Sequence, residues 1–339
     1  MIPPILWQFF FKIAAKILFI YEIGKKNTQI VLLYGLYFVP LHAKLICIFN
    51  LMKELVSVVM PTHNGDRFLE DSIRSILAQT YANLELLITD DCSDNSATLE
   101  ILHRYQKLDL RVDVLYLKEN KGPGYARNKS IERAKGRYIA FCDSDDRWFA
   151  DKLERQLAFM REKDCALCCS SYIVCNEKDE NIGIRISPIR ITYKMLERDN
   201  KIGCLTAIYD IKKLGEKFYM PTLRKRQDWA LFLTILKKCR LAYGLVEPLA
   251  YYRDRSHSVS SNKFSLVKYN VAVYHEILKF SWVKSYFYFF FIFLPASHSA
   301  ILQMITVLNI LLHLLDVQQN QKQVLKQSSS LQRRSMSLD

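Results

Sequence analysis

Short apolar runs alternate with amphipathic stretches between residues 55 and 174. Leu69, Ile73, Ile76 and Leu77 recur on one helical face, and Tyr125–Lys135 is short, alanine-containing and compatible with a helix. Because strands that alternate with helices are typical of βαβ units, we predict an α/β fold with a doubly wound, mostly parallel sheet. Such a sheet presents its ligands at the carboxyl ends of its strands. The five predicted strands are Leu55–Met60, Leu84–Thr89, Val112–Leu117, Arg137–Cys142 and Ala166–Val174.

The periodic pattern weakens after Asn176. We expect polar loops at residues 177–183 and 197–203, and then a helix over Trp229–Lys238. Two apolar runs, Tyr286–Leu294 and Ala300–Leu315, are shorter than the roughly 20 residues that a membrane span needs. With lysines beside them, residues 263–316 form either a helical extension at an anionic lipid surface or a buried pair of core helices. Residues 317–339, rich in Gln, Ser and Lys, are expected to be disordered.

Residues 1–54 form an apolar N-terminal extension with a different composition. Leu6–Ile20 carries two lysines, which favours an interfacial helix, whereas Ile30–Phe49 is long enough for a span if Pro40 and two basic side chains are tolerated. A signal peptide is not expected, because no small-residue cleavage site follows a clean apolar core. Alternatively, translation starts at Met52, directly before the first strand. The intact mass of the protein from its native source distinguishes these possibilities.

The charge balance favours an anionic partner. The 48 Lys and Arg residues against 34 Asp and Glu give a net charge of +14, which suits nucleic acid, membrane lipid or a phosphorylated substrate. The cations are scattered, with short clusters at residues 224–226 and 333–334, and no helix carries a stripe that could read a duplex. We therefore expect no nucleic-acid partner.

The nine cysteines are an odd number, and several lie inside apolar runs. This pattern is typical of reduced thiols that act as small buried hydrophobes. Cys165, Cys168 and Cys169 have a metal-like spacing but no second ligand pair, so we expect no zinc site.

Four polar clusters follow predicted strands, where the sheet presents a ligand. Asp90 and Asp91 in the second cluster can accept hydrogen bonds from a base imide or a ribose hydroxyl, while Ser93 or Asp94 caps the next helix. In the third cluster, glycines permit close approach of the backbone, and Arg127 at a helix N-terminus favours an anion. The clusters are Pro61-Thr62-His63-Asn64-Gly65, Thr89–Asn95, Gly122–Asn128 and Phe141–Asp146.

The fourth cluster contains Asp143-Ser144-Asp145. Carboxylates at i and i+2 in a bend can both face one divalent cation, whose other sites suit water and diphosphate oxygens. A cation there neutralises the charge that grows on a leaving diphosphate. For the triplet taken alone, the competing interpretation is a solvated acidic turn in which Asp146 caps a helix through Lys152 and Leu157.

Taken in order, the four clusters resemble glycosyltransferase family 2. That family places a Pro-x-Tyr-Asn turn, an Asp-Asp-Gly-Ser cluster, a Gly-x-x-x-Ala-Arg-Asn loop and an Asp-x-Asp motif after successive strands. The resemblance covers roughly Leu55–Asn262, which we expect to be the catalytic domain, with a GT-A fold. His63 stands for the usual Tyr and Cys92 for the usual Gly, and Cys92 puts the local turn geometry in question.

The resemblance implies roles for individual residues. Asp90 and Asp91 match the pair that holds uridine, Arg127 matches a residue next to the nucleotide, and Asp143 and Asp145 match the metal site, with Mn²⁺ or Mg²⁺ as the cation. Asp228, in Gln227-Asp228-Trp229, matches the general base; alternatively it caps the helix that follows. Arg253 and His257 match residues near the diphosphate. The remaining residues expected to contact the donor are Pro61, Thr62, Asn64, Gly122 and Ser144.

The function implied by the resemblance is transfer of one sugar from a nucleotide-sugar, a UDP-sugar, to a hydroxyl of a surface glycan such as lipopolysaccharide core or capsule, with inversion. A processive synthase would carry Gln-x-x-Arg-Trp and several clear membrane spans, which this sequence does not show. We expect a cytoplasmic enzyme in peripheral contact with the inner membrane. The alternative is an inactive nucleotide-binding, membrane-associated module. A dehydrogenase is disfavoured because no Gly-x-Gly-x-x-Gly follows the first strand.

Overall fold

The computed structural model describes residues 54–255 and 263–293, and the side chains of residues 267–289 in the second range. His257 and the predictions for residues 1–53 and 294–339 lie outside the described residues. The strands are β1 Val56–Thr62, β2 Leu84–Asp90, β3 Val112–Tyr116, β4 Tyr138–Phe141, β5 Arg147–Trp148, β6 Leu167–Cys175, β7 Asn181–Arg185, β8 Arg190–Thr192, β9 Ile208–Asp210 and β10 Leu241–Arg253. The helices are α3 Asp66–Leu77, α4 Ser96–Leu108, α5 Pro123–Arg133, α6 Lys152–Glu162, α7 Tyr193–Arg198, α8 Ile211–Leu214, α9 Gln227–Cys239, α10 Lys263–Ala272 and α11 Trp282–Phe293, with a 3₁₀ turn at Cys204–Thr206 and a π-helical turn at Val273–Ile277.

The sheet has the strand order β3-β2-β1-β4-β9-β6-β10-β5. Its first four strands are parallel, with β1 between β2 and β4. The short strand β9 then runs antiparallel to both β4 and β6, and β10 is parallel to β6. All five predicted strands are present within two residues of their expected ends, so the prediction of a mostly parallel α/β sheet is confirmed.

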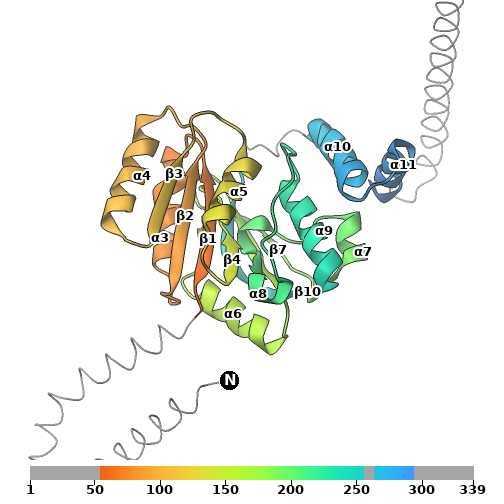
Figure 1. Ribbon diagram of the computed structural model, residues 1–339, viewed down its shortest axis with the longest axis horizontal. Coiled ribbons are helices and arrows are strands. Elements are labelled where there is room, and N and C mark those ends of the chain that lie inside the picture. The colour runs from red at the N-terminus through yellow and green to blue at the C-terminus, as the bar shows by residue number, and fades with distance from the viewer. Residues whose placement is uncertain (1–53, 256–262, 294–339) are drawn as a thin grey trace, which may run out of the picture. The chain divides into compact units, whose positions relative to one another are not determined.

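Helices cover both faces of this sheet, which is why its strands read as continuous apolar runs. On one face, Val58 and Met60 of β1 pack with α3, α4 and α6, and Figure 1 shows α3 and α4 beside the β1–β3 end of the sheet. The predicted apolar face of α3 is confirmed, because Leu69, Ile73 and Ile76 are fully buried. On the other face Val59 belongs to a core with α5 and α9. The sheet is therefore doubly wound.

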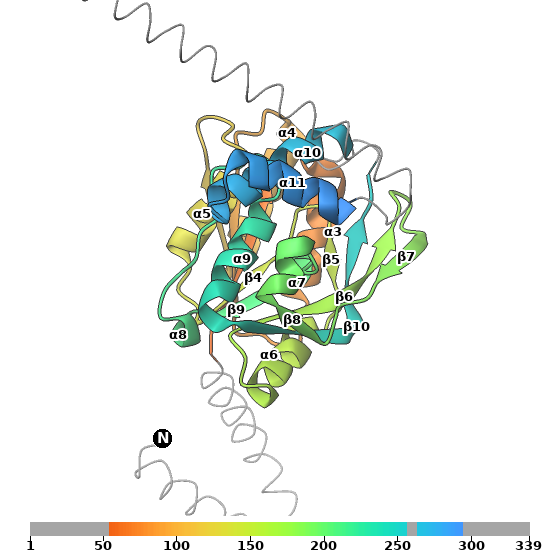
Figure 2. The ribbon, with the colours of Figure 1, turned by 90° about the vertical axis from the view of Figure 1, so that its right-hand side faces the viewer.

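Helix α9 is the main cover of the second face. Phe232 packs edge-on against Phe141 of β4, with ring centroids 6.3 Å apart. Figure 2 shows α9 beside α7 on this side of the sheet. The helix was expected over Trp229–Lys238 and extends from Gln227 to Cys239. Its length and position bring its N-terminal turn to the edge where β4 ends.

Several elements after residue 176 differ from the sequence expectation. The predicted loop at residues 177–183 is wrong in its last part, because Asn181 begins β7, and the loop at 197–203 begins inside α7. The 13-residue strand β10 was not predicted. Its pairing with β6 shifts register on both sides of Pro248, which lacks the N–H that a regular ladder needs.

The helices after residue 262 differ in how far they are buried. Val271, Val273 and Tyr274 are buried, and the Tyr274 ring lies 5.6 Å from that of Trp229 in α9. Helix α11, by contrast, exposes several large side chains. Among the described residues, no helix is long and apolar enough to cross a membrane.

Candidate active site

The first, second and fourth clusters lie together because β2, β1 and β4 are parallel neighbours. Thr62 at the end of β1 pairs with Asp90 at the end of β2, and the Asp91 N–H donates to the Thr62 carbonyl at 2.8 Å. Phe141 of β4 pairs with Val59 of β1. The predicted convergence of these motifs at one edge of the sheet is confirmed.

Asn64 links the first turn to the second. Its side-chain carbonyl accepts hydrogen bonds from the backbone N–H groups of Asp94 and Asn95, both at 3.1 Å. Its amide donates to the Asp94 carboxylate at 2.7 Å, and its own N–H donates to Ser93 Oγ at 2.9 Å. Asn64 therefore fixes the relative position of two loops that border the site. Pro61 and Thr62, the preceding residues of β1, are buried.

Asp90 and Asp91 are buried and hold backbone loops. Asp90 accepts hydrogen bonds from the N–H and the hydroxyl of Ser93, the former at 3.0 Å. The two Asp91 oxygens accept the N–H groups of Lys121 and Gly122 at 2.8 and 2.7 Å. Gly122 has a φ of 89°, in a region that favours glycine. Asp91 thus fixes the glycine turn against the end of β2.

Cys92 occupies a left-handed conformation with φ of 64°. A glycine adopts this conformation without strain, whereas a side chain costs about 1–2 kcal/mol. Cys92 therefore adopts the backbone conformation that glycine favours. The cap predicted at Ser93 or Asp94 is wrong: Asn95 is the N-cap of α4 and accepts the Thr98 N–H at 3.1 Å. Ser93 is instead committed to Asp90.

Arg127 connects the third cluster to the fourth. It lies in the second turn of α5, is almost fully buried, and pairs through Nη2 with Asp143 Oδ1 at 2.5 Å. Burial acts to lower the pKa of Arg127, but the Asp143 carboxylate and weaker neighbours outweigh it, so the pKa is raised overall. Arg127 is therefore a permanent cation next to Asp143 in the candidate site.

The acidic turn carries three carboxylates with different surroundings. Asp145 Oδ2 pairs with Arg255 Nη2 at 2.6 Å, while burial and then the charge of Asp143 raise the Asp145 pKa. Asp146 is buried, accepts the backbone N–H of Arg253 at 3.0 Å, and has a pKa raised well above its ordinary value by burial. The acidic turn is thus held in place by hydrogen bonds to Arg253 at the end of β10.

The alternative in which Asp146 caps the following helix is wrong. Helix α6 begins at Lys152 with Asp151 as its N-cap residue, and Arg147–Trp148 form β5 in between. Asp146 is tied to the end of β10 instead, over a sequence distance of 107 residues.

Asp228 of α9 interacts electrostatically with Arg127 and Asp143. It lies in the first turn, and the N-cap position is held by Arg226, so the alternative in which Asp228 caps the helix is wrong. Its Oδ2 accepts the Asn200 amide at 2.9 Å. Burial raises the Asp228 pKa, Arg127 and Arg226 lower it, and Asp143 raises it. These influences place the candidate base within electrostatic reach of the Arg127–Asp143 pair.

Arg253 and Arg255 have different environments. Arg253 is 2% exposed, donates to the Asp145 carbonyl at 3.1 Å, pairs with Asp179 at 2.7 Å, and lies over the Phe68 ring. Arg255 keeps 39% of its side chain exposed and pairs with Asp145. Sequence reasoning selected Arg253 and missed Arg255, since no local pattern distinguishes the two.

A depression of about 230 Å³ opens beside the acidic turn. Ser144 and Asp145 line one side of it, and Arg255 lines another. The other lining residues are His63, Asn64, Gly65, Arg67, Phe68 and Glu177. It is bordered by elements far apart in sequence and carries both signs of charge.

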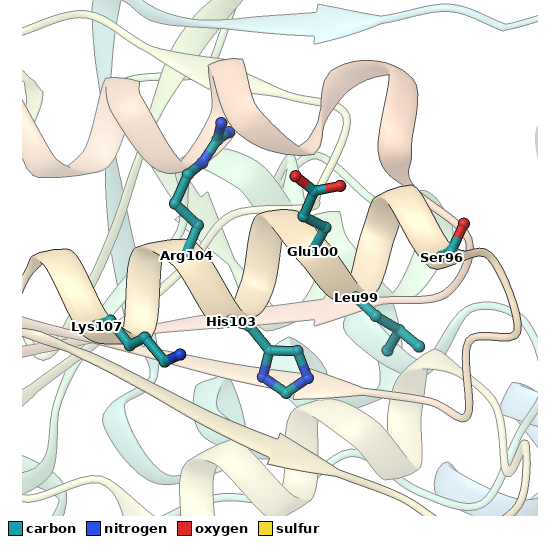
Figure 3. A pocket seen from close by; sticks show the side chains of 6 residues that line it. All are labelled: Ser96, Leu99, Glu100, His103, Arg104 and Lys107. Atoms are coloured by element: carbon teal, nitrogen blue, oxygen red, sulfur yellow. The ribbon is translucent and has the colours of Figure 1, made fainter.

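A second depression, of about 670 Å³, runs along α4 (Figure 3). All of its lining residues belong to that single helix: Ser96, Leu99, Glu100, His103, Arg104 and Lys107. Because polar groups from different elements do not converge there, the edge formed by β1, β2 and β4 remains the candidate active site.

The chemistry of the acidic turn fits a divalent cation shared with a ligand. The ion pairs of Asp143 and Asp145 use one carboxylate oxygen each, so each has a second oxygen that can face a cation. Across the described ranges, no group of three or more His, Cys, Asp or Glu side chains could hold an ion by itself. Diphosphate oxygens would have to complete the coordination.

The eight cysteines in the described part of the chain are free thiols.

A doubly wound sheet of this topology, with polar clusters at the ends of β1, β2 and β4, is typical of glycosyltransferases with the GT-A fold. The profile of "Glycosyl transferase family 2" matches residues 57–213. TuaG of Bacillus subtilis, provisionally assigned to teichuronic acid biosynthesis, is 43% identical over 69% of this chain and 92% of its own length. This chain belongs to glycosyltransferase family 2.

Other similar proteins agree with this family. The Escherichia coli enzyme WfgD, a UDP-Glc:alpha-D-GlcNAc-diphosphoundecaprenol beta-1,3-glucosyltransferase, is 37% identical over 63% of this chain and 83% of its own. The structure of Staphylococcus aureus TarS with UDP-GlcNAc superposes with a TM-score of 0.54 at 20% identity, covering 69% of each chain. Both TarS and a mannosyltransferase of Pyrobaculum calidifontis, with a TM-score of 0.50 at 15% identity over 84% of this chain and 91% of its own, support the fold.

Proposed function

We propose that this enzyme transfers one sugar from a UDP-sugar to a hydroxyl of a lipid-linked surface glycan, with inversion at the anomeric carbon. The observation that carries the proposal is that Arg127 pairs with Asp143 of the acidic turn and also interacts electrostatically with Asp228 at the start of α9. The relatives WfgD and WfaP act on GlcNAc-diphosphoundecaprenol, and TuaG is assigned to a surface polymer, which supports this acceptor class.

Donor binding would use the ends of β1 and β2. The buried carboxylates of Asp90 and Asp91 and the ordered turn at Asn64 border the position that a uridine would take, and Gly122 leaves room for close approach of the backbone. Ser144 and Arg255 line the adjoining depression, where the diphosphate would lie. Arg253 would act indirectly, because it donates to the Asp145 carbonyl and so fixes the acidic turn. His257 is proposed to contact the diphosphate directly.

Asp143 and Asp145 would hold Mn²⁺ or Mg²⁺. Such a cation, when bound, neutralises the developing charge of the leaving diphosphate. The carboxylates are already paired with Arg127 and Arg255. We therefore expect the cation to bind weakly alone and more tightly with UDP. The diphosphate can pair with Arg127 and Arg255, which frees the carboxylates of Asp143 and Asp145 for the cation. Calorimetric titration of Mn²⁺ with and without UDP checks this, and equal affinities would contradict it.

Asp228 would accept the proton of the acceptor hydroxyl as its oxygen attacks the anomeric carbon from the face opposite the diphosphate. The Asn200 amide donates to one oxygen of this carboxylate and thereby fixes its orientation. Attack from the opposite face inverts the configuration. Burial makes the carboxylate a stronger base than an exposed aspartate.

The localisation we propose is the cytoplasmic face of the inner membrane, with peripheral contact. A lipid-linked acceptor is confined to the bilayer surface, so the enzyme would have to work there. Residues 55–262 are proposed as the catalytic domain and residues 263–316 as the extension that makes this contact.

The direct test is UDP release from a panel of UDP-sugars, with detergent-extracted surface glycan as acceptor. Wild-type enzyme with Mn²⁺ or Mg²⁺ should release UDP, and Asp143→Asn and Asp145→Asn should not. Asp228→Asn should retain UDP binding but lose turnover by orders of magnitude, because only the proton acceptor is removed. UDP binding without turnover across the whole panel would instead favour the inactive nucleotide-binding module.

A further inference from the structure

Two tyrosines contact each other across the neighbouring strands β6 and β10 (Figure 2). The ring centroids of Tyr172 in β6 and Tyr252 in β10 are 5.9 Å apart, and the rings are inclined by 59°. Both side chains pack against the core that includes α3 and α6, yet both residues remain partly exposed. The pair therefore presents an aromatic surface on which an apolar face of a ligand can stack.

Tyr252 connects this surface to the acidic turn. It directly precedes Arg253, whose backbone N–H donates to Asp146 at 3.0 Å. The Arg253 Nε donates to the Asp145 carbonyl at 3.1 Å. Burial raises the pKa of Tyr252, and the charges of the carboxylates in the acidic turn raise it further. Tyr252 thus lies within electrostatic reach of the turn that would hold the cation.

Tyr172 connects the same surface to the segment that holds Asp228. The Asn200 amide donates to Asp228 at 2.9 Å, and the Asn200 carbonyl oxygen accepts the Ile202 N–H at 3.2 Å. The next residue, Gly203, lies against the Tyr172 ring so closely that a Cβ atom there would be 2.6 Å from Cε1. The missing side chain lets the backbone approach the ring. A continuous series of contacts therefore leads from the candidate base to the aromatic surface.

The electrostatic neighbours of Tyr172 agree with this position. Burial raises its pKa and Arg185 lowers it. The charges of Asp146 and Asp228 then raise it, so the ring lies within reach of both the acidic turn and the base. The depression assigned to the diphosphate is lined by other residues. The part of a substrate that lies on the tyrosines is therefore not its diphosphate.

We infer that Tyr172 and Tyr252 bind a pyranose ring of the acceptor by stacking on its apolar face. The C–H bonds on one face of a pyranose are attracted to the negative face of an aromatic ring. The acceptor hydroxyl has to reach Asp228 to lose its proton, so the sugar that carries it lies beside the base. The inference rests on the proposed function and gives its acceptor a binding surface. The donor sugar has the same chemistry, and the test separates the two.

The test measures steady-state kinetics of the full chain with Mg²⁺, a saturating UDP-sugar and detergent-extracted surface glycan as acceptor. Tyr172→Ala and Tyr252→Ala should each raise KM for the glycan about tenfold, because each removes an aromatic contact. The kcat should change by less than about twofold, since the contact is made equally before and during the reaction. KM for the UDP-sugar should be unchanged. Tyr172→Phe should retain the KM of wild type, because it keeps the ring face.

Tyr251→Ala is the matched control. Tyr251 is the neighbour of Tyr252 in β10, is also partly exposed, and packs against Phe149 with ring centroids 4.9 Å apart. Adjacent residues of a strand point to opposite faces of the sheet, so this variant removes the same group from the other side. It should leave KM for the glycan unchanged. If an alanine variant does not fold, Tyr172→Leu takes its place, because it fills the core without an aromatic face and should raise KM in the same way.

Three results would overturn the inference alone. They are an unchanged KM for the glycan in folded Tyr172 and Tyr252 variants, an equal rise in Tyr251→Ala, and the same rise in Tyr172→Phe as in Tyr172→Ala. A rise in KM for the UDP-sugar with an unchanged KM for the glycan would assign the surface to the donor sugar, and the acceptor assignment would be wrong. Wild-type enzyme that releases no UDP with any donor would refute the proposed function, and the inference with it.

Discussion

Lys152 is the first residue of α6 and is fully buried. Its Nζ has no hydrogen-bond partner and lies 4.0 Å from the centre of the Trp148 ring. Burial lowers the pKa of Lys152 from 10.5 to about 7, an effect that the nearby thiols of Cys142, Cys168 and Cys169 oppose only in part. Replacing this lysine by methionine, which has a similar length and no charge, should therefore stabilise the fold.

The magnitude follows from proton linkage. Each pKa unit corresponds to about 1.36 kcal/mol, so a pKa lowered from 10.5 to about 7 means that charging Lys152 costs the folded state about 4–5 kcal/mol. The folded state binds fewer protons than the unfolded state between these two pKa values. The cost is therefore fully present below pH 7, falls as the pH rises towards 10.5, and is absent above it.

We expect Lys152→Met to raise the free energy of unfolding by about 4 kcal/mol at pH 6 and by much less at pH 10.5. Urea denaturation at both pH values measures the difference, with Lys163→Met, an exposed lysine at the end of the same helix, as the control. A gain of the same size at both pH values would refute the electrostatic reasoning and leave only better packing. A loss of stability at pH 6 would refute it entirely.

Three further outcomes follow from the structure. Asp210→Ala should lower the free energy of unfolding by about 3 kcal/mol in urea denaturation, because it removes a carboxylate that is 1% exposed and pairs with Arg137, and also removes the N-cap of α8. Gly122→Ala should cost about 1–2 kcal/mol in the same assay, since φ is 89° there, and an unchanged midpoint would contradict that strain. The pH profile of kcat/KM should lose activity towards acid through a pKa above the ordinary 3.8 of aspartate, because burial raises the pKa of Asp228 and the base must be deprotonated; a profile flat down to pH 4 would exclude Asp228 as the base.

The half of the fold up to β4 could be predicted because its signals are local. Its strands are buried on both faces and read as uninterrupted apolar runs, and α3 shows its buried face at helical spacing. Ordered polar clusters at the ends of parallel strands then placed Asp90, Asp91 and Asp143 at one edge without any knowledge of their contacts.

Side-chain partners could not be predicted in the same way. Asn95 caps α4 because Ser93 is already bonded to Asp90, a choice between neighbours that the sequence leaves open. Strand β10 was hidden by Pro248, which interrupts its apolar pattern and is tolerated only where the register shifts. The N-cap of α4 and the formation of β10 were therefore determined by tertiary contacts rather than by local sequence propensity.

The two arginines at the end of β10 show the same limit at the active site. Arg253 and Arg255 are two residues apart and have the same chemistry, yet one is buried beneath the acidic turn and the other lines the depression beside it. What separates them is the end of β10: Arg253 is its last residue and pairs with Cys175 of β6, whereas Arg255 lies beyond the strand. Asp179 in the β6–β7 turn also pairs with Arg253. The acidic turn is therefore completed by residues more than 100 positions later in the chain. A substitution that disturbs β10 should alter the position of Asp145 before it alters the strands that the sequence makes obvious.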